Sequence, residues 1–205
     1  MRRTQHITDS GGDGEPIVLL HGFLSSSKYW RRLTPHLLSA GYRVIAIDLL
    51  GFGRAPKPTD LAYSYDDHIA YIHSAIKSLH LSRFTLVGHS MGALLASRYS
   101  IAHPDTINEL LLLHPPLFKD REEARTALFS TSRFYRFMLT SRLRSAGWAL
   151  MRTLSLRHIS AHNKASREGS LKNIIERAEM NHDYQRITVT TTFLVGTRDR
   201  KEYVK

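Results

Sequence analysis

The stretch Phe84–Gly92 reads FTLVGHSMG and decides the fold of this chain. Its first four residues are typical of β-strands, and the residues that follow it, ALLA at positions 93–96, are strong helix formers. The pattern predicts a strand, a sharp turn and a helix, with Ser90 at the tip of the turn. A serine hydroxyl held at such a tip is a candidate nucleophile.

The glycines on either side of Ser90 have a steric explanation. A serine at the tip of a strand-to-helix turn adopts a sparsely populated backbone conformation, and the flanking chains come so close that only glycine fits two residues before and two residues after. Gly88 and Gly92 occupy these positions. The helix that begins near Met91 then directs its free amides and its positive dipole end toward negative charge that develops beside Ser90.

Working outward from this stretch, short apolar runs alternate with helical patterns. Unbroken aliphatic runs of this kind are typical of parallel strands that are covered on both faces. Four further strands are predicted, at Ile17–Leu20, Tyr42–Ile47, Leu110–Leu113 and Thr190–Val195. Helices are predicted at Pro35–Ser39, from a cap at Asp66 to about Leu79, from Met91 to about His103, and at Leu171–Met180. The sequence therefore predicts an α/β protein with a doubly wound, mostly parallel sheet.

The segment from Leu117 to about residue 185 differs in composition from the rest. Between Ala124 and Arg167 there is no Asp or Glu, while nine Arg and Lys residues give this stretch a net charge of +9 out of +11 for the chain. Aromatic and aliphatic residues alternate with them, which predicts helices with an apolar underside and a basic outer face. The charge fits a solvated outer face over a packed lid, or attraction to an anionic membrane or an acidic partner. No nucleic-acid-binding motif accompanies it, so we expect no nucleic acid partner.

Other features limit the class of protein. A chain of 205 residues can bury one sizeable core. It contains no cysteine, which permits a reducing compartment, and residues 1–14 contain no apolar segment typical of a signal peptide, so we expect a cytoplasmic protein. No run of apolar residues is long enough to span a membrane. No His and Asp cluster has metal-ligand spacing, and we expect neither a metal nor an organic cofactor.

Four separated motifs carry a resemblance to a known family. They are His21-Gly22-Phe23, Asp48-Leu49-Leu50-Gly51-Phe52-Gly53, Gly88-His89-Ser90-Met91-Gly92 and Gly196-Thr197-Arg198-Asp199. In this order, from about Glu15 onward, the chain resembles a capped α/β-hydrolase.

The resemblance implies specific roles. Ser90 would be the nucleophile and Asp199 the acid of a catalytic triad, and the backbone amides of Phe23 and Met91 would form the oxyanion hole. His21, Gly22, Gly88, His89 and Gly92 would support these groups. Residues 1–116 and 186–205 would form the hydrolase core, and residues 117–185 a helical cap over the substrate pocket.

The chain departs from the family pattern at the general base. In the family the order is Ser, acid, His, yet no histidine follows Asp199. The last strand and the last helix of the fold are also missing, so we expect a C-terminally truncated chain. His114 ends a central strand on the edge where parallel sheets bind ligands, and it is the candidate for a substitute base. Asp48 is expected to accept hydrogen bonds from nearby amides and to fix its turn.

Two functions from different classes follow. The first is a serine hydrolase that cleaves a small ester, thioester, lactone or amide, with an apolar acyl or aromatic part, through an acyl-enzyme. The second is a catalytically inactive protein that binds a ligand on the same scaffold.

Overall fold

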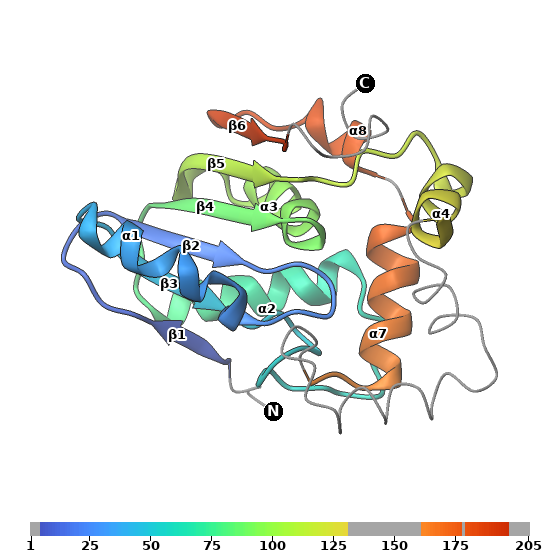
Figure 1. Ribbon diagram of the computed structural model, residues 1–205, viewed down its shortest axis with the longest axis horizontal. Coiled ribbons are helices and arrows are strands. Elements are labelled where there is room, and N and C mark those ends of the chain that lie inside the picture. Colours follow the sequence, from blue (N-terminus) through green and yellow to red (C-terminus); the bar gives the residue numbers. More distant parts are fainter. Residues whose placement is uncertain (1–4, 131–160, 178, 197–205) are drawn as a thin grey trace.

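The computed structural model describes residues 5–130, 161–177 and 179–196 of the chain. In the described residues, one sheet is formed by β1 (Ile7–Asp9), β2 (Pro16–Leu20), β3 (Arg43–Ile47), β4 (Phe84–His89), β5 (Ile107–Leu113) and β6 (Thr191–Leu194). The strand order is β1-β3-β2-β4-β5-β6, and all neighbours are parallel except β1 and β3 (Figure 1). The predicted α/β fold with a mostly parallel sheet is confirmed. The antiparallel strand β1 is an addition, because three residues are too few for a strand pattern in the sequence.

The register of the central strands brings two loops together. Leu20, the last residue of β2, pairs with Gly88 of β4, and Gly88 pairs on its other side with Leu112 of β5. Parallel strands end at the same edge of a sheet. The loop that begins at His21 and the turn that contains Ser90 therefore leave the sheet side by side.

Apolar layers cover both faces of the sheet, as a parallel sheet requires. On one face the core includes Leu20, Ile47 and Leu86 from the strands, together with residues of α2 (Tyr65–Ser78) and α3 (Met91–Ala102). On the other face Leu19 and Val87 pack with Trp30 of η1 (Ser27–Arg32), a 3₁₀ helix, and with α1 (Thr34–Ser39). Figure 1 shows α1 on one side of the sheet and α2 and α3 on the other. A short 3₁₀ helix, η2 (Pro104–Thr106), connects α3 to β5.

The cap of α2 corrects the sequence prediction. Ser64, not Asp66, is the N-cap: its hydroxyl accepts a hydrogen bond from the Asp67 amide at 3.3 Å, and the Asp67 carboxylate accepts one from the Ser64 amide at 2.9 Å. This reciprocal pair is a capping box. The helix starts earlier than predicted because Tyr65 is buried in its first turn.

The described part of the predicted cap consists of α4 (Arg121–Ser130), α7 (Lys164–Ser170), η3 (Leu171–Ile175), a π-helix, and α8 (Met180–Tyr184). The single helix predicted at Leu171–Met180 is wrong. Asn163 caps α7 eight residues before that range begins. The π-turn of η3 ends the helical run, with the Glu176 amide donating to the Leu171 carbonyl at 2.9 Å. Residues 131–160, which hold most of the basic stretch, lie outside the described residues.

These helices lie beyond the carboxyl ends of the strands (Figure 1). The side chain of Asn163 donates a hydrogen bond to the Lys57 carbonyl at 2.7 Å, and that of Asn173 donates to the Ala62 carbonyl at 2.6 Å. The segment is therefore fixed to the loop between β3 and α2. Within the described ranges, no helix has the length and apolar character needed to cross a membrane.

Candidate active site

Ser90 sits at the junction of β4 and α3 in a strained conformation. Its φ is 53° and its ψ is −119°, outside the regions that a non-glycine residue ordinarily adopts. The surrounding hydrogen bonds hold it there: its amide donates to the Leu113 carbonyl of β5 at 3.0 Å, and its carbonyl accepts the Ala93 amide at 2.8 Å. Such conformations cost about 1–3 kcal/mol and persist only where neighbouring structure enforces them.

The two glycines of the turn have the close contacts that the sequence predicts. A Cβ atom at Gly88 would lie 2.6 Å from the carbonyl carbon of Gly92 and 2.7 Å from the Cα of Ala93. A Cβ atom at Gly92 would lie 2.6 Å from the carbonyl oxygen of His21. The strand, the helix and the loop after β2 therefore approach one another more closely than any side chain at these positions allows.

The loop after β2 passes directly against Ser90. A Cβ atom at Gly22 would lie 3.2 Å from the Cβ of Ser90 and 3.0 Å from Nδ1 of His89. The next residue, Phe23, is half buried, and its ring packs edge-on against Phe52 with 5.8 Å between ring centroids. Leu24 then takes a φ of 58° and is buried. The backbone of this loop is thus fixed within reach of the Ser90 side chain.

His21 anchors this loop and uses both of its ring nitrogens to do so. Nδ1 lies 2.8 Å from the Gly22 carbonyl and Nε2 lies 2.9 Å from the Leu49 amide. The carbonyl can only accept and the amide can only donate, so the ring is neutral with its proton on Nδ1. Burial lowers the pKa of His21 to about 4 and keeps it neutral. The ring has no free nitrogen for proton transfer to Ser90.

Asp48 joins three segments around the same loop. Its carboxylate accepts hydrogen bonds from the amides of Ser27 at 2.6 Å and Arg54 at 2.7 Å, and His6 Nδ1 lies 3.0 Å away. Burial acts to raise the pKa of Asp48, but the hydrogen bonds from Arg54 and Ser27 outweigh it and hold that pKa below its usual value. The prediction that Asp48 binds nearby amides and fixes its turn is confirmed.

Two histidine rings lie beside the turn. His89 stacks on Tyr29 with 4.6 Å between centroids, and the ring of His114 meets it edge-on at 5.9 Å. His114 has a φ of 47°, is exposed, and donates its amide to the Leu194 carbonyl at 2.9 Å. The ring of the candidate substitute base thus contacts the ring of His89, the residue that precedes Ser90. Tyr29, in η1, is not among the residues predicted from the sequence. The signal in the sequence is an aromatic residue shortly after the loop that follows β2.

Asp199 lies outside the described residues, which end at Gly196 after β6. A cavity of about 410 Å³ is found at the opposite edge of the sheet, where β5 begins, and it is lined by residues such as Arg83, Ile107 and Thr190. It is therefore distant from the carboxyl edge that carries Ser90. Among the described side chains, no group of three or more His, Asp or Glu is placed to hold a metal ion.

Comparison with curated proteins gives relatives that are hydrolases by name. The chain is 39% identical over 122 residues to the probable lysophospholipase BODYGUARD 2 of Arabidopsis thaliana, and the matched region covers 57% of this chain and 26% of that protein. It is 38% identical over 136 residues to a haloalkane dehalogenase of Mycobacterium marinum, covering 66% of this chain and 46% of that protein. The matched regions thus span about a quarter to a half of these relatives.

The fold is also found in solved structures and in a family model. The bromoperoxidase of Bacillus anthracis superposes with a TM-score of 0.72 at 24% identity, covering 96% of this chain and 79% of the other. A family model described as the alpha/beta hydrolase fold matches residues 15–199, which include the turn at Ser90, the loop at His21 and the strand that leads to Asp199. The chain belongs to the alpha/beta hydrolase fold family.

Proposed function

We propose that the protein is a serine hydrolase that cleaves a carboxylic ester or a related acyl compound through an acyl-enzyme. The observation that carries the proposal is the strained conformation of Ser90 at the start of α3, with the Gly22 loop pressed against its Cβ. A strained backbone conformation persists only where the surrounding structure enforces it, and such residues cluster at active sites. Ser90 is the nucleophile of the proposal.

The proposal includes two backbone amides that would stabilise negative charge beside Ser90. Met91 is the first residue of α3, so its amide has no partner within the helix, and the positive end of the helix dipole lies there. Phe23 follows Gly22 in the loop that contacts Ser90. We assign these two amides to the oxyanion hole, where they would bind the oxygen of the tetrahedral intermediate.

The reaction begins when a base removes the proton of the Ser90 hydroxyl, and the oxygen then attacks the acyl carbon. The bond to the leaving group breaks, the leaving group takes up the proton, and water hydrolyses the acyl-enzyme in a second, equivalent step. Asp199 would orient the base. The proposal allows two sources for this base, His114 and a histidine of a longer protein outside these 205 residues. His21 is excluded by its two hydrogen bonds.

The chemistry of serine favours acyl substrates. Attack of a serine oxygen on an acyl carbon gives an ester that water can hydrolyse, whereas displacement of a halide from an alkyl carbon would give an ether with no acyl carbon for water to attack. Among the two named relatives, the lysophospholipase therefore fits Ser90 better than the dehalogenase. The proposed substrate is a small ester with an apolar acyl or aromatic part, bound under the cap formed by residues 117–185.

The basic stretch supports a second, separate proposal, contact with anionic membranes. Nine basic and no acidic residues between Ala124 and Arg167 would draw the cap toward anionic lipid headgroups. Within the described part, Arg121 and Arg125 already face Glu176, at 3.4 and 3.8 Å. Arg167 is buried. Membrane contact is therefore assigned to the basic residues of the predicted cap other than these three.

Labelling with a fluorophosphonate tests the role of Ser90. The full-length protein, meaning the natural protein that contains these 205 residues, should form one covalent adduct, and peptide mapping should place it on Ser90. The Ser90→Ala variant should remain unlabelled while it keeps the far-UV circular dichroism of the parent. A folded protein that does not react, or an adduct on another serine, would favour a ligand-binding protein on the same scaffold.

A further inference from the structure

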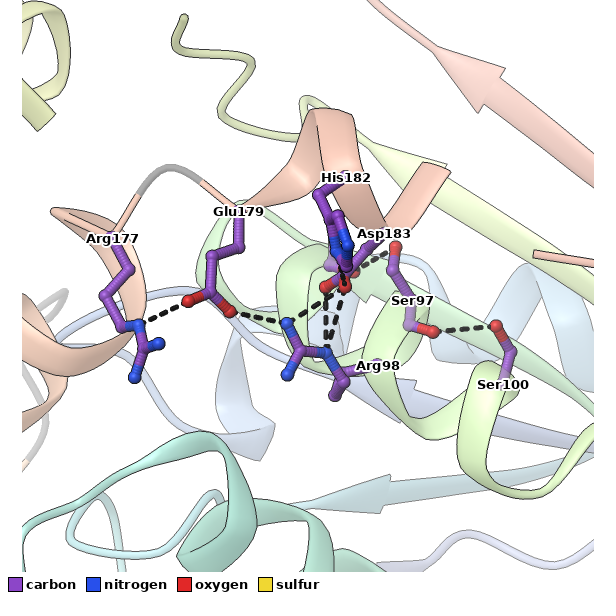
Figure 2. A network of polar contacts seen from close by, with 8 residues as sticks. Ser97, Arg98, Ser100, Arg177, Glu179, His182 and Asp183 are labelled. Carbon is purple, nitrogen blue, oxygen red and sulfur yellow. Dashed lines mark hydrogen bonds and ion pairs between the residues drawn. The ribbon is translucent and has the colours of Figure 1, made fainter. Parts of the chain in front are cut away.

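Arg98 is the single charged residue in the twelve residues of α3, the helix that begins directly after Ser90. Almost all of α3 is buried, and its serines 97 and 100 bond back to helix carbonyls. Figure 2 shows the Arg98 side chain directed toward the segment that carries Glu179 and Asp183. A charge in such a helix requires partners, because an unpaired buried charge is strongly unfavourable.

Two carboxylates share the Arg98 guanidinium. Nε lies 2.9 Å from Oδ2 of Asp183, and Nη2 lies 2.9 Å from Oδ1, so the two groups face each other in a bidentate pair. Nη2 also donates to Oε2 of Glu179 at 2.6 Å. Asp183 is 1% exposed, which leaves its carboxylate almost no contact with water. We call Arg98, Glu179 and Asp183 the clamp.

The clamp connects three parts of the chain that are distant in sequence. Arg98 belongs to the helix after Ser90, Asp183 to α8 at the end of the predicted cap, and the Arg98 guanidinium also lies 4.2 Å above the ring of Tyr65 in α2. This cation–π contact fixes the plane of the guanidinium. Arg177 adds an ion pair on the outer oxygen of Glu179, at the exposed end of the network (Figure 2).

A buried ion pair contributes little net stability, because the desolvation of both charges offsets their attraction. In some proteins such a pair instead specifies a single arrangement of the elements that it joins. An apolar contact between α3 and α8 would tolerate sliding, whereas a bidentate pair with a second carboxylate does not. The clamp is therefore suited to position α8 relative to α3 rather than to hold the protein together.

We propose that Arg98 is a positioning residue, which through Asp183 and Glu179 fixes the end of the cap over the helix that begins at Ser90 and so shapes the acyl-chain site. This inference rests on the proposed hydrolase function. The inference predicts a difference between substrates with short and with long acyl groups. A short acyl group needs only Ser90 and the oxyanion amides, whereas a long acyl group must also fit against the cap. Loss of the clamp should therefore raise KM for long-chain esters much more than for short-chain esters.

The test compares Arg98→Met with Arg177→Met in the full-length protein. Arg177 has an exposed side chain that contacts only the outer oxygen of Glu179 in this network, so it is a matched control for the loss of one arginine. For Arg98→Met, kcat/KM for a p-nitrophenyl ester of about eight carbons should fall about 10-fold or more, through KM, while the acetate ester changes less than about 2-fold. Arg98→Lys should recover part of the loss, since one ammonium can bind one carboxylate.

Hydrogen–deuterium exchange gives a readout that does not depend on hydrolysis. Amides of residues 179–184 should exchange faster in Arg98→Met and in Asp183→Asn, but not in Arg177→Met. Unchanged exchange, or equal losses with short and long esters, would overturn the positioning role. If Arg98→Met does not fold, the positioning role is tested instead with Arg98→Lys and Asp183→Asn, by the same ester kinetics and the same hydrogen–deuterium exchange. If the protein shows no Ser90-dependent hydrolysis, hydrogen–deuterium exchange alone tests whether the clamp fixes residues 179–184.

Discussion

Gly22 packs against Ser90 so closely that a Cβ atom at position 22 would lie 3.2 Å from the Cβ of the serine. The two residues follow different strands, β2 and β4, and the pairing of Leu20 with Gly88 places them together. The contact joins the predicted nucleophile to the loop that carries a predicted oxyanion amide. It can be tested without altering any group that takes part in the chemistry.

Gly22→Ala should lower kcat about 10-fold, because the added methyl group pushes the loop and Ser90 apart by a few tenths of an ångström and catalysis is sensitive to such shifts. The control is Gly11→Ala. Gly11 has a φ of 84° and open space around it, so this variant should lose about 1–2 kcal/mol of stability but no activity. Ester hydrolysis and urea unfolding of both variants separate the two effects. A fully active Gly22→Ala variant would show that the loop does not position the reaction.

Stability should fall between pH 6.5 and pH 4 because of two buried histidines. Burial lowers the pKa of His21 and of His68 to about 4 in the folded protein, whereas an unfolded histidine titrates near 6.5. Below pH 6.5 the unfolded state binds protons that the folded state does not, so the free energy of unfolding decreases. At pH 5 the loss is about 2 kcal/mol for each histidine.

Urea unfolding of His68→Gln at several pH values checks this contribution. Nε2 of His68 lies 3.1 Å from the Ser170 hydroxyl, and a glutamine amide can keep a hydrogen bond there. The variant should show about half of the parent's loss between pH 7 and pH 5. Identical pH profiles for parent and variant would contradict the assignment.

Ser64→Ala should destabilise the protein by about 1 kcal/mol, since it removes the N-cap of α2 and half of its capping box. Asp66→Asn provides the comparison, because Asp66 lies in the first turn but is not the cap. It should lose less than about 0.5 kcal/mol, from its favourable position near the helix dipole. Chemical unfolding midpoints measure both. A larger loss of stability in Asp66→Asn than in Ser64→Ala would identify Asp66 as the N-cap, as the sequence predicts.

His114→Ala distinguishes the two sources of the base. If a histidine outside these 205 residues serves, the full-length variant should keep its activity within about 3-fold, whereas loss of a triad member costs about 10³-fold or more. The pH profile of kcat/KM for the parent reports the pKa of the same base. A loss of three orders of magnitude in His114→Ala would assign the base to this residue.

The turn at Ser90 could be predicted because its determinants are local. The change from strand to helix formers, and the need for glycine at positions 88 and 92, both follow from a few neighbouring residues. The cap of α2 was misplaced for a local reason as well. Asp66 is an acceptable cap by residue type, and only the burial of Tyr65 moves the start of the helix back to Ser64.

The clamp could not be predicted because its partners are distant in the sequence. Arg98 and Asp183 are separated by 85 positions, and no periodicity connects them. The sequence contains one signal, a lone arginine in an otherwise uncharged helix, which requires a partner without identifying it. Strand β1 is similar, since three residues become a strand only by pairing with β3.

The most direct test of the central claim is the burst kinetics of p-nitrophenyl ester hydrolysis by the full-length protein and its Ser90→Ala variant. An acyl-enzyme that forms faster than it is hydrolysed releases one equivalent of p-nitrophenol per active site before the steady state. We expect such a burst in the parent, its absence in Ser90→Ala, and a kcat at least about 10³-fold lower in that variant. Turnover by Ser90→Ala within about 10-fold of the parent would remove Ser90 from the mechanism and contradict the account.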